Sequence, residues 1–509
     1  MKTSMSQLKM GVMLSYVSLG LHNIIGLLYT PFMLRCMGQS EYGLYSLAAS
    51  IVAYLTILDF GFGDAVVRYT AKFRAEGKIS EQYSLFGMII ICYTFIAFIT
   101  IIFGTILYYN VDCFFDKTMT LEELNKTRLM MLLLTINLAL TFIFSIFGSI
   151  ITAYENFIFQ KIVYIVRIVL QPCIMIPLLL WGYKAVSMVV VISTLNIICL
   201  LINTYYCIYK LNIKVYFSNF NWLLLKEIGS YTFYTFIAFI VYRISWNSGQ
   251  FVLGALVGTS AIAVYAVAMQ LKDFYSNAST AISSVFLPKV TAMITQKISN
   301  EEISNLFIRV GRIQYIIMAF ILSGFILFGK EFINIWAGKD YEEAYTITLI
   351  IMIPLIVPLV QNIGITILQA KNQLKFRSLL YIIVAIIGIA LSILLAKKYS
   401  GIGCAIGTSI SLILGNVIVI NIYYWKKIKI DIPRFWKEIS QISIPIISIT
   451  IIYLVIKNNI IYSNSIILIA EILSFAIFYL VFIWKFGMNI YEKELFITFL
   501  KGLRKQNDK

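Results

Sequence analysis

Seven ionisable residues of this chain lie inside long apolar stretches, where a charged side chain is costly and is usually retained for a function. They are His22, Asp59, Arg167, Arg243, Lys272, Asp273 and Glu471. Arginine offers phosphate oxygens a planar fork of donors, and lysine offers a point charge. Carboxylates and histidine can carry a proton through a membrane. The set could therefore bind an anion and couple its movement to that of a proton or another cation.

Arg243 is the strongest candidate for an anion ligand, because it lies about midway along its apolar stretch. From that depth a side chain cannot extend to the water at either membrane surface. Lys272 lies in a stretch dense in Gln, Ser, Asn and Thr, which favours a cavity wall over a lipid-facing surface. We therefore predict an electropositive central cavity for an anionic substrate rather than a cationic drug. Its predicted substrate-binding residues are Arg243, Lys272, Arg167, Tyr242, Trp246 and Asn277.

A second group of residues is predicted to couple or gate the movement of the substrate. Asp59 and Asp273 are candidate carriers of a proton or cation, and His22 is the only histidine of the chain. His22 also falls in a stripe of small and polar residues at helical spacing, which predicts a cavity-lining face. Each of these residues could instead have a purely structural role. Asp59 could pair with Arg68, and His22 could be a hydrogen-bonded packing residue. Lys272 and Asp273 could each pair with another helix.

The elements that position these residues are apolar stretches, each long enough for a helix to cross a bilayer. Their approximate bounds are 11–35, 41–63, 84–109, 127–153, 162–183, 185–208, 228–257, 260–288, 313–330, 344–370, 378–396, 401–425, 439–456 and 463–484. The chain is 60% apolar and 13% charged, far from the composition of a soluble domain. Backbone groups in lipid must be satisfied within a segment, which favours helices over a barrel. The predicted fold class is an all-α polytopic membrane protein with about 14 transmembrane helices.

The short breaks between the apolar stretches carry nearly all the charges and divide them unevenly. Taken alternately from residue 1, one set of breaks holds 28 Lys/Arg and 12 Asp/Glu, and the other holds 10 and 9. Short loops rich in Lys and Arg stay on the cytoplasmic side. This predicts a bacterial inner-membrane protein with cytoplasmic N- and C-termini, in which residues 11–35 also act as a retained targeting signal. Because the net charge of +17 is spread over eight short loops, we predict no nucleic-acid partner.

An internal repeat divides the chain. Residues 38–47 resemble residues 258–267, at an offset of 220. Acidic loops on the outer side and basic loops on the inner side recur in the same order at similar offsets. Six stretches in each half begin on the same side, which predicts two parallel six-helix lobes with a substrate site between them. The predicted parts are an N-terminal lobe (1–220), a C-terminal lobe (221–430), and two appended helices with a cytoplasmic tail (431–509).

Other features argue against a cofactor and against an enzyme. The seven cysteines show no paired spacing, so neither a disulfide framework nor a zinc site is predicted. The sequence has no Walker-type phosphate loop, which argues against ATP hydrolysis by the chain itself. The largest outer loop, 110–126, carries acidic residues but no histidine and no metal-like cluster. We therefore predict no cofactor, no metal and no catalytic residues.

The N-terminal part of the chain resembles a known family. The matching segments are 26–35 (GLLYTPFMLR), Gly38, 41–47 (EYGLYSL), 58–63 (LDFGFG), 67–69 (VRY) and 71–72 (AK). They resemble bacterial polysaccharide biosynthesis proteins, the lipid-linked oligosaccharide flippases (O-antigen or capsule repeat-unit translocases) of the multidrug/oligosaccharidyl-lipid/polysaccharide exporter superfamily. The later segments match that family by length and by the number and grouping of their spans only.

The resemblance implies alternating-access transport of an undecaprenyl-pyrophosphate-linked oligosaccharide repeat unit from the cytoplasmic to the periplasmic leaflet. It implies a cationic cavity for the pyrophosphate, contact with membrane lipids, and coupling to a proton or sodium ion. It also implies partners in the same pathway, namely a polymerase and glycosyltransferases. At the motif positions it implies structural or gating roles for Arg35, Asp59 and Arg68.

Three alternatives remain open at this point. A multidrug or metabolite cation-coupled antiporter of the same superfamily would favour buried carboxylates, and here buried Lys/Arg and Asp/Glu are equal in number. An integral-membrane enzyme, such as a repeat-unit polymerase, would need a sizeable outer loop with catalytic groups. A non-transporting scaffold would not need charges at mid-membrane. An electropositive cavity therefore favours the flippase.

Overall fold

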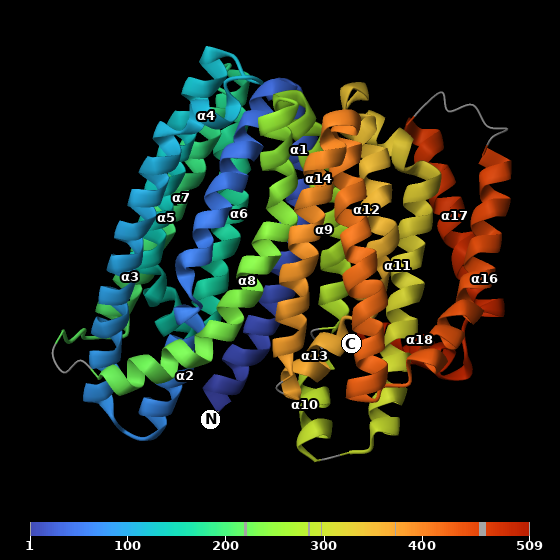
Figure 1. Ribbon diagram of the computed structural model, residues 1–509. Coiled ribbons are helices and arrows are strands. Elements are labelled where there is room, and N and C mark those ends of the chain that lie inside the picture. Colours follow the sequence, from blue (N-terminus) through green and yellow to red (C-terminus); the bar gives the residue numbers. More distant parts are fainter. Residues whose placement is uncertain are drawn as a thin grey trace. The chain divides into compact units, whose positions relative to one another are not determined.

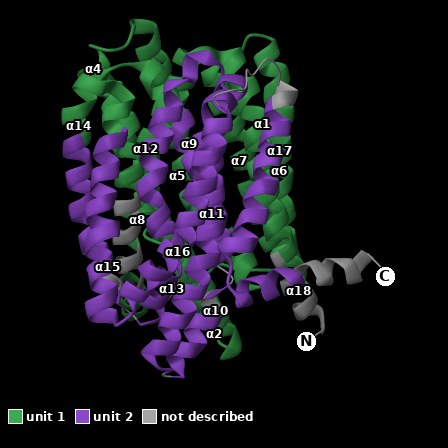
Figure 2. Ribbon diagram, turned by 90° about the vertical axis from the view of Figure 1, so that its right-hand side faces the viewer, with its two compact units in different colours: residues 1–266, 392–404 green, residues 267–391, 405–509 purple. Residues whose placement is uncertain are grey.

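A computed structural model describes residues 2–217, 221–283, 286–296, 298–371, 373–457 and 465–507. Within these ranges the regular structure is helical, without strands. The chain forms two compact units, coloured separately in Figure 2. Unit 1 comprises residues 1–266 and 392–404, and unit 2 comprises residues 267–391 and 405–509. Helices α9 (Thr259–Ser283) and α14 (Leu374–Leu412) contribute residues to both units.

Unit 1 is built from long helices around an apolar core (Figure 1). Besides the start of α9 and a segment of α14, its helices are α1 (Lys2–Leu55), η1 (Thr56–Asp59), α2 (Phe62–Ala75), α3 (Ile79–Tyr109), α4 (Val111–Phe115), α5 (Leu121–Ala153), α6 (Phe157–Leu180), α7 (Ala185–Tyr205), η2 (Tyr206–Lys210) and α8 (Trp222–Leu256). Phe86, Tyr93 and Ile146 lie in the core and are almost completely buried. This core holds α2, α3 and α5 together beside the short η1 segment.

Unit 2 has its own core, where α11, α16 and α17 pack together. Besides the rest of α9 and α14, its helices are α10 (Leu287–Thr295), α11 (Asn300–Trp336), η4 (Lys339–Tyr341), α12 (Glu343–Val360), α13 (Ile363–Ala370), η5 (Ile413–Val419), α15 (Ile420–Tyr423), η6 (Tyr424–Ile428), α16 (Ile432–Lys457), α17 (Ser465–Phe486) and α18 (Ile490–Asn507). Aromatic rings dominate the core: Phe475 of α17 contacts the rings of Phe328 and Tyr453.

The helices match the predicted membrane spans. Ten segments of the described chain are long and apolar enough to cross a membrane. Two of them contain a bend, at Gly38 and at Ser400, and each of these joins two predicted spans. Helix α8 (Trp222–Leu256) corresponds to the predicted span 228–257, and α9 (Thr259–Ser283) corresponds to most of the span 260–288. The chain is therefore an all-α, multi-pass membrane protein, and a count of about 14 spans is consistent with these helices.

The bends recur at matching places in the two halves of the sequence. A positive backbone φ interrupts a regular helix, and residues other than glycine adopt it only at a steric cost. Six of the eleven residues with a positive φ in the described chain form three pairs separated by 217–220 positions: Gly38 (φ 78°) and Gly258 (126°), Gly182 (89°) and Ser400 (49°), Asn212 (51°) and Lys429 (62°). Because these pairs follow one another in the same order along the chain, they support the internal repeat predicted from residues 38–47 and 258–267.

One predicted span is not continuous. The stretch 41–63 reads as a single apolar run, but α1 ends at Leu55 and the tight turn η1 follows. Phe60 (φ 53°) and Gly61 (φ 72°) then adopt the left-handed region before α2 begins at Phe62. Glycine tolerates this conformation without a steric cost, which allows the break. Asp59 therefore lies in an interruption of the helix rather than on a regular helical face.

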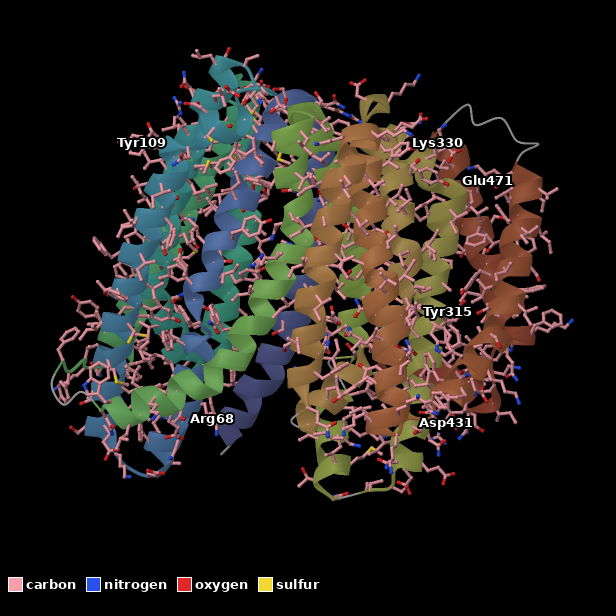
Figure 3. The ribbon with its side chains drawn as sticks, viewed as in Figure 1. Arg68, Tyr109, Tyr315, Lys330, Asp431 and Glu471 are labelled. Carbon is pink, nitrogen blue, oxygen red and sulfur yellow. The ribbon has the colours of Figure 1, made fainter. Side chains whose placement is uncertain are left out.

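At the other end of unit 1, marked by Tyr109 in Figure 3, α9 begins against α1. A Cβ atom on Gly43 would lie 2.0 Å from the carbonyl oxygen of Thr259, so only glycine permits this approach. The Glu123 carboxylate at the start of α5 accepts hydrogen bonds from the hydroxyls of Ser40 and Thr259. The beginning of α9 is thus fixed to α1 and α5 within unit 1.

Candidate functional site

A cavity of about 260 Å³ lies in unit 1 beside the interruption in the helix. Its wall is formed by residues of the break, of α5 and of α8: Thr56, Ile57, Asp59, Phe60, Gly61, Leu138, Thr141, Phe142, Ser145, Phe236 and Arg243. The rings of Phe60 and Phe236 stack with their centroids 4.2 Å apart and join the break to α8. Two predicted site residues, Asp59 and Arg243, therefore share one cavity although 184 positions separate them in the sequence.

The Asp59 carboxylate is positioned by a buried tyrosine of α3. The Tyr93 hydroxyl donates a hydrogen bond to Asp59 Oδ1 at 3.0 Å. Tyr93 is itself held by the rings of Phe62 and Phe142. Asp59 forms no ion pair with a described residue, so the alternative in which it pairs with Arg68 is not observed. The sequence offered no sign of Tyr93, because only the folded chain brings α3 to the break.

The Arg243 side chain is half-buried and makes no hydrogen bond or ion pair with a described residue. In particular, its guanidinium does not approach the Asp59 carboxylate to within the 4.0 Å of a salt bridge. A cationic side chain that is removed from bulk water and lacks a partner gains most from a bound anion. Arg243 is therefore the residue of this cavity best suited to hold a phosphate group.

Arg167 is linked to the same cavity through asparagines that the sequence reasoning missed. Its Nη1 donates to Asn196 Oδ1 at 2.8 Å. The Asn196 amide nitrogen donates to Thr141 Oγ1 at 2.7 Å and to Asn137 Oδ1 at 2.9 Å, and Thr141 lines the cavity. Polar asparagines at positions 137 and 196, inside apolar stretches, were the available signal. This network extends the polar character of the cavity wall to α6 and α7.

Replacing Asn196 by leucine is expected to destabilise the protein, because it leaves the Arg167 guanidinium and the Asn137 amide oxygen without their partner. A buried polar group left unsatisfied costs about 1–3 kcal/mol. Thermal unfolding of the purified protein in detergent measures the loss. Asn203→Leu on the same helix is the matched control, because the Asn203 amide oxygen is buried without a described partner. We expect this control to be neutral or stabilising, and an equal loss in both variants would contradict the role of the network.

The other predicted binding residues lie in several places. Trp246 is half-buried on α8, three positions after Arg243 and thus on the same side of the helix. The side chain of Tyr242 lies outside the described residues. In unit 2, the ammonium group of buried Lys272 pairs with the carboxylate of exposed Asp273, its neighbour on α9. Asn277 follows on α9 and is half-buried.

The remaining predicted gating residues lie outside this cavity. His22 and Arg35 of α1 are exposed, as is Arg68 of α2, whose guanidinium lies 5.8 Å from the centroid of the Tyr69 ring. Figure 3 places Arg68 at the lower end of unit 1. Glu471 of α17, which the sequence left without a partner, accepts a hydrogen bond from the Tyr453 hydroxyl at 2.8 Å.

Long bundled apolar helices, a break between two helices and charged groups around a cavity are typical of a membrane transporter. Residues 8–293 match the family described as polysaccharide biosynthesis protein. This match covers more than half of the chain, so the chain belongs to that family.

The individual proteins to which this chain is similar are transporters or flippases by their names. The chain is 22% identical over 404 residues to a Shigella flexneri protein named "Putative O-antigen transporter", covering 77% of this chain and 92% of that protein. Its fold is similar to that of the lipid II flippase MurJ in an inward closed conformation, with a TM-score of 0.73, 17% identity, and coverage of 93% of this chain and 97% of that one. An inward-facing multidrug resistance MATE transporter of the MOP superfamily gives a TM-score of 0.63 at 14% identity, covering 83% of this chain and 99% of that one.

Proposed function

We propose that the protein is a flippase that moves an undecaprenyl-pyrophosphate-linked oligosaccharide repeat unit from the cytoplasmic to the periplasmic leaflet. The observation that carries this proposal is the Arg243 guanidinium, which has no partner among the described residues and lines a cavity beside a helix break. An unpaired cation within the membrane region favours an anionic substrate. Membership of the polysaccharide biosynthesis family supports a lipid-linked sugar as that substrate.

The charged head group would bind as follows. One phosphate accepts hydrogen bonds from Arg243, which replace part of the hydration that the anion loses on entry. Thr141 offers a hydroxyl on the same wall, and Arg167 adds positive charge behind it through Asn196. A volume of about 260 Å³ suits a diphosphate group better than a complete oligosaccharide, so the sugars and the prenyl tail lie outside it. Four further residues would contact the remainder of the head group: Lys272, Tyr242, Trp246 and Asn277.

Transport would proceed by alternating access. The lobes 1–220 and 221–430 would rock against each other, with 431–509 as an appendage. Asp59, oriented by Tyr93, would take up a proton or sodium ion and reset the cycle. Asp273, His22, Arg35 and Arg68 would have coupling or gating roles at other points of the path.

The orientation in the bacterial inner membrane follows from the loop charges. Arg68 marks the lower end of unit 1 and Tyr109 the upper end, and Asp431 and Lys330 mark the corresponding ends of unit 2 (Figure 3). The breaks richer in Lys and Arg contain Arg68 and Asp431, and therefore the lower end of each unit would face the cytoplasm. Both termini would then lie in the cytoplasm, where the enzymes of the pathway assemble the substrate.

Complementation tests the function. In a strain that lacks the flippase for its own surface polysaccharide, we expect the wild-type chain to restore that polysaccharide and to lower the accumulated lipid-linked repeat unit. Both quantities are measured, so that absence of the donor lipid is not mistaken for absence of transport. Failure to restore the polysaccharide while the cognate donor lipid accumulates would contradict the proposal and favour a multidrug or metabolite antiporter.

A further inference from the structure

The C-terminal helix α18 differs in direction from the other helices of unit 2. Figures 1 and 2 show it running across the lower end of the unit rather than along the bundle. It follows α17 after a short link that ends at Asn489. The Asn489 side chain accepts a hydrogen bond from the backbone N–H of Glu492, and the Glu492 carboxylate accepts one from the N–H of Asn489, each at 2.9 Å. This reciprocal cap defines where α18 begins.

The first turn of α18 is clamped to two other helices by Arg312 of α11. The Arg312 guanidinium binds the Glu492 carboxylate through two nitrogens, at 2.6 and 3.1 Å. It also donates to Glu438 Oε2 of α16 at 2.8 Å and to the Gly487 carbonyl at 3.2 Å. Arg312 and Glu492 are 4% and 5% exposed. A buried pair that is saturated with hydrogen bonds holds a fixed geometry, so the position of the first turn is set by the protein.

Apolar side chains of α18 remain exposed on more than one side of the helix. Ile490, Leu495 and Ile497 are 77%, 46% and 40% exposed. Helix α17 also carries exposed apolar side chains along its length, as a helix that faces lipid does. Exposed apolar residues on a helix at the end of a membrane span are typical of a helix lying in the bilayer interface.

The charge around α18 identifies the partner. Residues 485–509 contain six Lys/Arg and three Asp/Glu, and one of these acids, Glu492, is paired with Arg312. Basic residues next to a membrane span attract anionic lipid headgroups over a distance of about a Debye length. A helix with exposed apolar side chains, in a segment of net positive charge, is therefore complementary to an anionic bilayer surface.

We propose that α18 is an interfacial helix that binds the anionic phospholipid headgroup layer. The proposal is independent of the transported substrate. Because Arg312 ties the first turn to α11 and α16, this lipid contact also restrains the ends of two membrane-spanning helices.

Amide hydrogen exchange on the full-length protein tests this proposal. The protein is placed in nanodiscs of phosphatidylcholine alone, or of phosphatidylcholine mixed with phosphatidylglycerol. We expect amides 494–507 to exchange more slowly in the anionic discs, while amides 490–493 remain equally protected by the clamp. Added salt should reduce the difference, since it screens the attraction.

A double variant and its matched control test the charge. Each basic residue near an anionic surface changes the attached fraction about fivefold. The variant Lys501→Gln with Lys505→Gln should therefore lower the lipid-dependent protection about 25-fold. Lys397→Gln with Lys398→Gln removes two exposed charges elsewhere and should leave it unchanged. Equal exchange in the two kinds of disc would overturn the proposal, and so would protection that depends on two protein copies per disc instead of on phosphatidylglycerol.

Discussion

Replacing Arg243 by alanine is expected to reduce surface polysaccharide about 10- to 100-fold in the complementation assay, because each hydrogen bond to a charged group is worth about 1.5–3 kcal/mol. Arg243→Lys keeps the charge but loses the planar fork, so we expect an intermediate level. The measurement is surface polysaccharide at matched membrane expression, with the donor lipid quantified in each strain.

Arg434→Ala is the matched control for the Arg243 variant. Its exposed side chain hydrogen-bonds Asn305 and does not line the cavity, so polysaccharide should stay at the wild-type level. If Arg243→Ala restored as much polysaccharide as the wild type, flipping would stand and Arg243 would be discarded as the phosphate ligand. A loss in both arginine variants would indicate a general defect in assembly rather than a defect in binding.

Replacing Gly43 by alanine is expected to destabilise unit 1 strongly. The new Cβ would lie 2.0 Å from the Thr259 carbonyl oxygen, which belongs to backbone and cannot rotate away. Overpacking of this kind costs about 1–3 kcal/mol and shifts the neighbouring helix. The decrease in unfolding temperature can be measured by fluorescence, with the wild type and the variant in the same detergent.

Gly20→Ala, on the same helix α1, is the control for the Gly43 variant. A Cβ at Gly20 has no heavy atom within 4 Å, so this change should be neutral or stabilising, as alanine favours helix more than glycine does. Equal unfolding temperatures for the two variants would show that the approach of α9 to α1 is looser than the distance implies.

The spans of this protein could be predicted from its sequence because lipid imposes a simple length rule on apolar helices. The position of Arg243 midway along its apolar stretch also identified it as a candidate, and the structure places it beside a cavity. The interruption at residues 56–61 could not be predicted, since Leu58, Phe60 and Phe62 are as apolar as any span and the left-handed turn leaves no hydropathy signal. The partners of Asp59 and Arg167 could not be predicted either, because Tyr93 and Asn196 come from helices that only packing brings near.

The Glu123 carboxylate has a consequence for the evolution of the chain. It binds the hydroxyls of Ser40 and Thr259, which stand 219 positions apart and come from the two different copies of the internal repeat. Loss of either hydroxyl would remove one hydrogen-bond donor to the Glu123 carboxylate, and loss of the carboxylate would leave both hydroxyls without this acceptor. Selection therefore acts on the three residues together, although Ser40 and Thr259 belong to different copies of the repeat. Among relatives we expect positions 40, 123 and 259 to covary.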